Sequence, residues 1–217
     1  MKNIVVFGCG GHAKVIIDIL EKSNEFNILG FIDHFVAEGT IVFGYEVLGD
    51  ETTLQANSKI AGGIVAIGDN FVRSLMVEKI KEINPKFNFI TAVHPTSIIA
   101  RGVELGEGTA VMPGAIINSD SKIGEHCIIN TKASIDHDCR IGDYVSLAPG
   151  VTLGGNVAIG QHSAVSLGSS IIHSVKIGQH TIIGAGSTVL KDIESNVIAY
   201  GAPAKVIRTR TTGEKYL

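Results

Sequence analysis

The sequence predicts two folds in one chain: an α/β domain with a small parallel sheet over residues 1–94, then an all-β parallel β-helix over residues 95–217. The β-helix is predicted from an aliphatic residue at every sixth position between residues 99 and 189, with no insertion. The α/β domain is predicted because short apolar runs alternate there with amphipathic helical patterns. A six-residue unit cannot bury its apolar face alone, so its copies must stack.

The six-residue repeat is visible in three columns of the sequence. The aliphatic column comprises Ile99, Leu105, Val111, Ile117, Ile123, Ile129, Ile135, Ile141, Leu147, Leu153, Ile159, Val165, Ile171, Ile177, Ile183 and Val189. The residue two places before each of these is always small or β-branched, which suits a side chain facing the same narrow interior. The residue after the aliphatic is often glycine, as at Gly124 and Gly142, which permits a close corner. Each unit is therefore a short strand and a turn.

Residues 1–94 carry a different pattern. Strands are expected at residues 3–7, 28–32 and 64–67, a helix through the apolar residues at 15, 16, 19 and 20, and another helix at residues 70–83. Gly8, Gly10 and Ala13 lie in the first strand-to-helix turn, and Asp33 follows about twenty residues later, as in a dinucleotide-binding fingerprint. The domain has about half the length of a two-lobed Rossmann fold, so this Rossmann-like domain is expected to hold one nucleotide rather than NAD. The alternative is a tight turn without a ligand.

Composition and charge exclude several classes of protein. The chain has 18 Lys and Arg against 21 Asp and Glu, so it lacks the basic excess of a nucleic-acid-binding protein. The apolar run at residues 4–7 is too short for a signal peptide or a membrane span. Cys9, Cys127 and Cys139 have no metal-binding spacing and are odd in number, so we expect reduced thiols and a cytoplasmic location.

The histidines fall into two kinds. His126, Tyr144, His162 and His180 recur every eighteen residues at equivalent turn positions, which predicts a stacked structural edge. His137 instead lies between two aspartates, and the residues one coil away from it are not histidines. A neighbouring carboxylate orients an imidazole and raises its basicity, so His137 is a candidate general base. On spacing alone, a surface histidine in a polar turn is an equal alternative.

The whole chain resembles the bacterial sugar acetyltransferases of the NeuD/PglD type, which include sialic acid O-acetyltransferases and amino-sugar N-acetyltransferases. The matching motifs are GCGGHA at residues 8–13, FID at 31–33, IGDN at 67–70, His94-Pro95, IINTKASIDHDCRIGD at 128–143, LGGN at 153–156 and GAPAK at 201–205. The resemblance implies a left-handed β-helix, acetyl-CoA as co-substrate, no metal, and a homotrimer with active sites between subunits. It also implies that the N-terminal domain holds a nucleotide-linked sugar.

The resemblance assigns roles to particular residues. It implies that His137 is the general base and Asp138 its acidic partner, and that Asn130 lies near the acceptor amine. The acetyl-CoA contacts that it implies are Gly155, Leu167 and Ala185. The candidates that it implies for the nucleotide sugar are Gly8, Gly10, Gly11, His12, Asp33, His34 and Arg73. Arg73 suits a diphosphate, although a solvated helix residue is an equal interpretation.

Two departures from the family pattern bear on the acceptor. Ser146 stands where many relatives carry a second histidine, and His34 replaces an acidic residue of some relatives that use UDP-sugars. The expected function is N-acetylation of the 4-amino group of a nucleotide-linked 4-amino-4,6-dideoxy sugar for surface glycan or glycoprotein biosynthesis. UDP is the first expectation for the nucleotide, with GDP or dTDP as alternatives. Sialic acid O-acetylation is the alternative function.

Other protein classes fit less well. A γ-type carbonic anhydrase needs zinc-binding histidines five residues apart, and no pair of the eight histidines has that spacing. A structural solenoid would carry a regular outward array, whereas the outward positions here are mixed. The tail from Thr209 to Leu217 has no readable role and is expected to be mobile.

Overall fold

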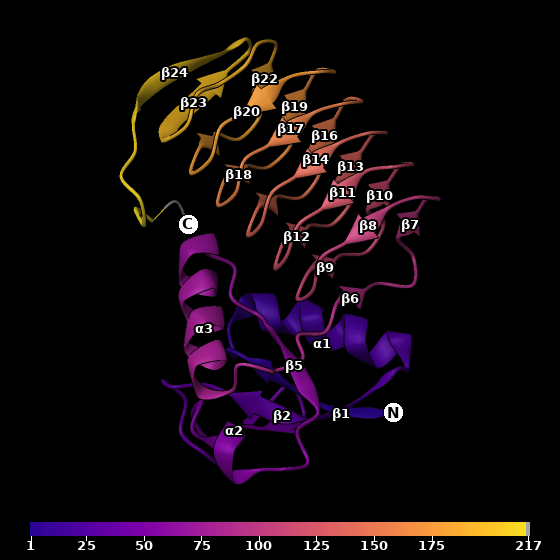
Figure 1. Cartoon of the computed structure of the whole chain (residues 1–217), viewed down its shortest axis with the longest axis vertical. Coiled ribbons are helices and arrows are strands. Elements are labelled where there is room, and N and C mark those ends of the chain that lie inside the picture. Colours follow the sequence, from indigo (N-terminus) through magenta and orange to yellow (C-terminus); the bar gives the residue numbers. More distant parts are fainter. Residues whose placement is uncertain (216–217) are drawn as a thin grey trace.

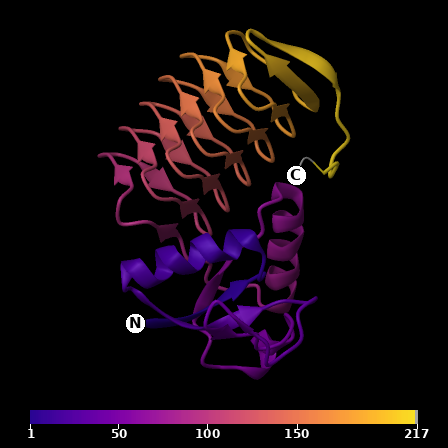
Figure 2. The same cartoon turned by 180° about the vertical axis from the view of Figure 1, so that it is seen from behind.

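The protein is described by a computed structural model over residues 1–215, and it has two parts that pack against each other (Figure 1). A three-stranded parallel α/β domain lies at one end, and a parallel β-helix extends from it; Figure 2 shows the same arrangement from behind. The predicted fold class is therefore confirmed. No helix among the described residues is long and apolar enough to cross a membrane.

The N-terminal sheet has the strand order β2-β1-β5, with all neighbours parallel. The elements of the whole N-terminal domain in chain order are β1 (Lys2–Phe7), α1 (Gly11–Ser23), β2 (Phe26–Ile32), the β3 (Ile41–Val42) and β4 (Tyr45–Glu46) hairpin, α2 (Thr53–Ala56), β5 (Gly62–Val65) and α3 (Asn70–Ile83). The predicted helix at 70–83 is confirmed as α3, and Asp69 caps its N-terminus by accepting a hydrogen bond from Val72 N at 2.9 Å. The strand predicted at 64–67 is found two residues earlier, over Gly62–Val65.

The β-helix consists of three sheets whose strands are joined by short turns, and all neighbouring strands are parallel except β23 and β24, which pair antiparallel. The first sheet contains β7 (Ile98–Ile99), β10 (Ile116–Ile117), β13 (Ser134–Ile135), β16 (Thr152–Leu153), β19 (Ser170–Ile171) and β22 (Thr188–Val189). The second contains β8 (Glu104–Leu105), β11 (Lys122–Ile123), β14 (Arg140–Ile141), β17 (Ala158–Ile159) and β20 (Lys176–Ile177). The third contains β6 (Ala92–Val93), β9 (Ala110–Val111), β12 (Ile128–Ile129), β15 (Ser146–Leu147), β18 (Ala164–Val165), β21 (Ile182–Ile183), β23 (Val197–Gly201) and β24 (Ala204–Thr209).

The predicted aliphatic column forms the interior of this β-helix. Its members are buried from Val111 onward, whereas Ile99 remains 37% exposed because no coil covers that end of its sheet. Four hydroxyl residues two places earlier are also buried and donate to carbonyls of the next coil: Thr109, Ser121, Ser163 and Ser169. Thr109 Oγ1, for example, donates to Gly124 O at 2.8 Å, so its burial leaves no hydrogen bond unmade.

The glycines that follow the aliphatic residues are required for a different reason from the expected corner geometry. None of those at 124, 142 and 160 has a positive φ. A Cβ atom on Gly142 would lie 2.7 Å from Gln161 N in the next coil, so glycine allows neighbouring coils to approach. The left-handed corner falls two residues later, where Tyr144 has φ 58°.

The predicted structural edge is confirmed as a continuous stack of rings, which we call the ring stack: His126, Tyr144, His162 and His180. Successive ring centroids lie 5.3, 4.8 and 4.8 Å apart, with interplanar angles of 11°, 11° and 4°. Phe89 closes one end against His126 at 4.7 Å. Burial lowers the pKa of His126 to about 3 and that of His162 to about 4, so these rings are neutral near pH 7.

Helix α3 and the C-terminal segment dock along this edge. Asn70 Nδ2 donates to His162 O at 2.7 Å, and Arg210 Nη1 donates to His180 O at 3.2 Å. Arg210 is only 5% exposed, so the expectation of a mobile tail is wrong for the described part of it. The reason is the docking of Arg210 onto backbone carbonyls of the β-helix, which the tail sequence alone did not indicate. Residues 216 and 217 lie outside the described residues.

Candidate active site

A pocket of about 550 Å³ opens at the carboxyl ends of the N-terminal strands. Its lining includes six of the seven predicted nucleotide-sugar residues, namely Gly8, Gly10, Gly11, His12, Asp33 and His34. The N-terminus of α1 faces this pocket, and helix N-termini attract phosphate groups because their first backbone N–H groups have no partner within the helix. The motif that the sequence singled out therefore surrounds one cavity.

The Asp33 carboxylate organises the wall of this first pocket. Its Oδ2 accepts a hydrogen bond from Cys9 N, and its Oδ1 accepts one from Phe35 N, both at 2.8 Å. These bonds join the turn after β1 to the loop after β2, so the side chain shapes the pocket as well as lining it. Burial, with the Asp33 charge beside it, raises the pKa of the Cys9 thiol to about 12, which keeps that thiol protonated.

A second pocket of about 340 Å³ lies next to the first, against the third sheet of the β-helix. It brings together Asn130, Leu167 and Ala185, three residues that the family resemblance had proposed for different ligands. Ser146 lines it as well. The structure thus places residues implied for the acceptor and for acetyl-CoA around one cavity, and their roles there stay a prediction.

His12 and Gly68 line both pockets, so they form the wall where the two cavities meet. Burial chiefly, and the Arg73 charge secondarily, lower the pKa of His12 to about 4. The ring is therefore neutral near pH 7. Gly68 was not singled out from the sequence; its place in the IGDN motif was the available signal.

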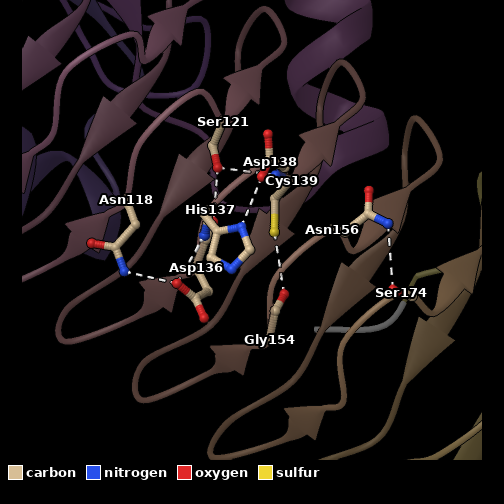
Figure 3. A network of polar contacts seen from close by, with 9 residues as sticks. All are labelled: Asn118, Ser121, Asp136, His137, Asp138, Cys139, Gly154, Asn156 and Ser174. Carbon is tan, nitrogen blue, oxygen red and sulfur yellow. Dashed lines mark hydrogen bonds and ion pairs between the residues drawn. The ribbon is translucent and has the colours of Figure 1, made fainter.

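His137 lies at a different corner of the β-helix, in the turn after β13 (Figure 3). Its Nδ1 is 2.7 Å from Asp138 Oδ2, and its backbone N–H donates to Asp136 Oδ1 at 2.9 Å. Asn118 Nδ2 also donates to Asp136 Oδ1, at 3.0 Å, which holds that carboxylate in place. The hydrogen bond to Asp138 raises the pKa of His137, and the Asp136 charge adds to this.

This geometry defines which ring nitrogen of His137 is available for chemistry. A carboxylate accepts hydrogen bonds, so Nδ1 carries the proton toward Asp138 and Nε2 keeps its lone pair. The His137 side chain is 61% exposed, so Nε2 is accessible from outside the coil. The next coil contributes Gly155, whose missing side chain leaves the space that the ring occupies: a Cβ there would lie 2.7 Å from Nε2.

Arg73 does not line the nucleotide pocket, where its predicted contact with a diphosphate would place it. Its side chain is 1% exposed, is absent from the linings of both pockets, and is neither a diphosphate contact nor a solvated helix residue. The guanidinium donates to the backbone oxygens of Ile67, Gly68, His126 and Tyr144 and to Ser146 Oγ. The regular helix pattern around Arg73 could not reveal this, because the partners come from the β-helix.

Comparisons with known proteins match both parts of the chain. Residues 3–80 match the family described as PglD N-terminal domain, and residues 120–155 match bacterial transferase hexapeptide (six repeats). Along 113 residues the chain is 37% identical to UDP-N-acetylbacillosamine N-acetyltransferase of Bacillus subtilis. That alignment spans 50% of this chain and 50% of the relative, so the chain matches about half the length of this curated protein.

Solved structures match over nearly the whole chain. A histidine-to-asparagine variant of perosamine N-acetyltransferase from Caulobacter crescentus, in complex with CoA and GDP-perosamine, is 38% identical with a TM-score of 0.88. The match covers 95% of this chain and 97% of that one. The acetyltransferase domain of PglB from Neisseria gonorrhoeae, solved in complex with acetyl coenzyme A, is 27% identical with a TM-score of 0.86, over 95% and 99% of the two chains.

Fold and site together define a hexapeptide-repeat transferase with a Rossmann-like N-terminal domain. The 38% sequence identity to the Caulobacter protein, across almost the full length of both chains, shows which family of such transferases this is. The chain belongs to the PglD-type family of sugar acetyltransferases.

Proposed function

We propose that this protein transfers the acetyl group of acetyl-CoA to the 4-amino group of a nucleotide-linked 4-amino-4,6-dideoxy sugar, for surface glycan or glycoprotein biosynthesis in the cytoplasm. The observation that carries the proposal is the joining of a phosphate-attracting α/β pocket to a pocket on the β-helix through the wall of His12 and Gly68. The N-acetyltransferase activity named for the Bacillus relative and the GDP-perosamine bound to the Caulobacter relative support an amino-sugar acceptor.

In this proposal the nucleotide occupies the first pocket and the sugar reaches toward the second. Asp33 accepts hydrogen bonds from the ribose hydroxyls, and the α1 N-terminus with Gly10 and Gly11 receives the diphosphate. His34 lines the same pocket. UDP, GDP and dTDP all satisfy this chemistry, and the assay below distinguishes them.

The chemistry follows from the orientation of His137. As the sugar amine attacks the thioester carbonyl, Nε2 removes its proton, and the imidazolium that forms is stabilised by Asp138. The tetrahedral oxyanion accepts a hydrogen bond from the Gly155 N–H. The C–S bond then breaks, and the CoA thiolate takes the proton from His137. Leu167 and Ala185 lie along the pantetheine arm, and no step needs a metal.

The separation between His137 and the second pocket supports an oligomeric site. His137 is not among the residues lining either of the two pockets, and this favours a site to which a second subunit contributes the base. A homotrimer in which the His137 corner of one subunit faces the second pocket of its neighbour completes the site. Subunit complementation tests this arrangement.

The complementation experiment combines two inactive variants. His137→Ala removes the base, and Ala185→Trp fills the second pocket from an exposed position that is not part of the core. Co-expressed with separate affinity tags, the two variants should regain activity in mixed trimers, because some sites combine an intact His137 with an open pocket. Mixed trimers as inactive as the parents would contradict a shared site, and the single variants provide the baseline.

The activity itself is tested by release of free thiol from acetyl-CoA. The acceptors are UDP-, GDP- and dTDP-linked 4-amino sugars, with free and CMP-linked sialic acid in parallel. The proposal predicts turnover of an amino sugar and a fall in kcat of about 10²–10⁴-fold for His137→Ala, the usual contribution of a general base. An unchanged rate in that variant would remove His137 as the base.

A further inference from the structure

The two pockets share a wall but belong to different domains, so the relative position of the domains determines whether one ligand fits both. The first pocket belongs to the N-terminal domain, whereas most of the second is lined by strands of the β-helix such as β15. A ligand that fills both pockets must cross the domain boundary at His12 and Gly68. Its affinity therefore depends on how accurately the two domains are held relative to each other.

Arg73 connects the two sides of this boundary through one planar group. Its Nη1 donates to Gly68 O at 2.9 Å, while its Nη2 donates to Ser146 Oγ at 3.1 Å. Its Nε donates to His126 O at 2.9 Å. Because the guanidinium is rigid and buried, these bonds fix the position of Ser146 relative to the pocket wall.

The bond from Arg73 also determines what Ser146 offers to a ligand. The Ser146 oxygen accepts from Arg73, so the hydroxyl hydrogen is available to donate elsewhere, and Ser146 lines the second pocket. In the same pocket, Asn130 Oδ1 accepts a hydrogen bond from Thr131 N at 2.8 Å, so the amide NH₂ of Asn130 is the group that can donate to a ligand. The pocket thus presents hydrogen-bond donors, which match the hydroxyl and ring oxygens of a sugar.

We propose that Ser146 and Arg73 are positioning residues for the acceptor. Ser146 donates a hydrogen bond to an oxygen atom of the sugar, and Arg73 holds Ser146 in register with the nucleotide pocket. This inference rests on the proposed function, in that it assumes a ligand with a nucleotide in the first pocket and a sugar in the second. It assigns a role to the serine that stands where many relatives carry histidine.

The test compares two ligands that differ only in the sugar. Isothermal titration calorimetry measures the Kd of UDP and GDP, which reach the first pocket alone, and of the UDP- and GDP-linked 4-amino-4,6-dideoxy sugars, which reach both. Ser146→Ala should weaken binding of the nucleotide sugar about three- to ten-fold, the value of one hydrogen bond, and leave the nucleoside diphosphate within about two-fold. Ser146→Thr, which keeps the hydroxyl, should restore the sugar affinity.

The matched control is Ser170→Ala, which removes the same hydroxyl from the equivalent strand position in the first sheet and should bind both ligands as the wild type does. Arg73→Lys keeps the charge but loses the planar fork, so it should reproduce the selective loss, and adding Ser146→Ala to it should cost little more. Because Arg73→Lys also removes domain contacts, its thermal unfolding is measured, and the serine variants remain decisive if it fails to fold.

Two results would overturn the inference alone: equal weakening of both ligands by Ser146→Ala, or no weakening of either. A wild-type protein that binds nucleoside diphosphates no less tightly than nucleotide sugars would overturn it as well. A wild-type protein that binds none of these ligands, and neither dTDP nor its linked 4-amino sugar, would overturn the proposed function itself, and the inference with it.

Discussion

Gly155→Ala perturbs the candidate base without removing it. Gly155 lies one coil beyond His137, and its backbone oxygen accepts from Ser174 N at 2.9 Å, a bond that alanine retains. Gly155 has no positive φ, so its backbone conformation accepts a side chain. The added methyl group therefore acts on the neighbouring imidazole rather than on the coil.

The size of the effect follows from three distances. The new Cβ would lie 2.7 Å from both Cε1 and Nε2 of His137 and 3.2 Å from its Cδ2. Unstrained contacts of this kind are about 3.5–4.0 Å, so the ring must retreat by about 1 Å. A displacement of about 1 Å at a reacting group lowers the rate by about 10²-fold. We expect a fall in kcat of that order, with thermal unfolding near that of the wild type.

The assay is thiol release at saturating acetyl-CoA and acceptor, measured on Gly155→Ala, His137→Ala and the double variant. If the methyl group acts through the ring, Gly155→Ala should have almost no further effect once His137 is absent. An unchanged kcat in the single variant would show that the methyl group does not displace a catalytic ring. Equal effects of Gly155→Ala with and without His137 would show that the methyl group acts elsewhere, for example on the acetyl group.

Three further predictions concern titration and binding. The hydrogen bond to Asp138 raises the pKa of His137, and only the neutral ring accepts a proton. Asp138→Asn should therefore lower that pKa and move the acid limb of the kcat/KM profile to lower pH. An acid limb that stays in place would exclude Asp138 as the partner of His137. Asp33→Ala should raise the KM of the nucleotide sugar much more than that of acetyl-CoA, whereas equal increases would count against a nucleotide site at Asp33. The pKa of His126 is about 3 in the folded protein against an ordinary value of 6.5. Between these values the His126 ring is protonated in the unfolded chain only, so the free energy of unfolding falls as the pH drops from about 6.5 toward 3. His126→Asn, which tolerates the left-handed backbone at φ 52°, should reduce this dependence by about 1.4 kcal/mol per pH unit in urea titrations, and an unchanged slope would place the acid sensitivity elsewhere.

The β-helix could be predicted in detail because its repeat is encoded locally. A period of six residues determines which side chains face inward, and an eighteen-residue coil places His126 above the next ring at Tyr144. The ring stack could therefore be inferred by counting residues. The same counting places Gly155 one coil from His137, which the structure shows as direct packing.

The positions of Arg73 and Arg210 could not be predicted in this way. Both donate to backbone carbonyls of the β-helix, and a backbone carbonyl acceptor leaves no trace in the sequence because every residue has one. The shared wall of the two pockets was hidden for a related reason. It depends on how the domains pack, and that packing is set by an apolar cluster joining α1 residues such as Ile16 to Met112 and Ile128 of the β-helix.

Acetyl transfer to a nucleotide-linked amino sugar is best tested by identifying the acetylated product. Wild-type protein is incubated with acetyl-CoA and a mixture of nucleotide-linked 4-amino sugars and sialic acids, and the products are resolved by mass spectrometry and NMR. We expect an amide on the 4-amino group of one nucleotide sugar, and its disappearance with His137→Ala. An acetyl ester on sialic acid, with the amino sugars unchanged, would contradict the proposed N-acetylation.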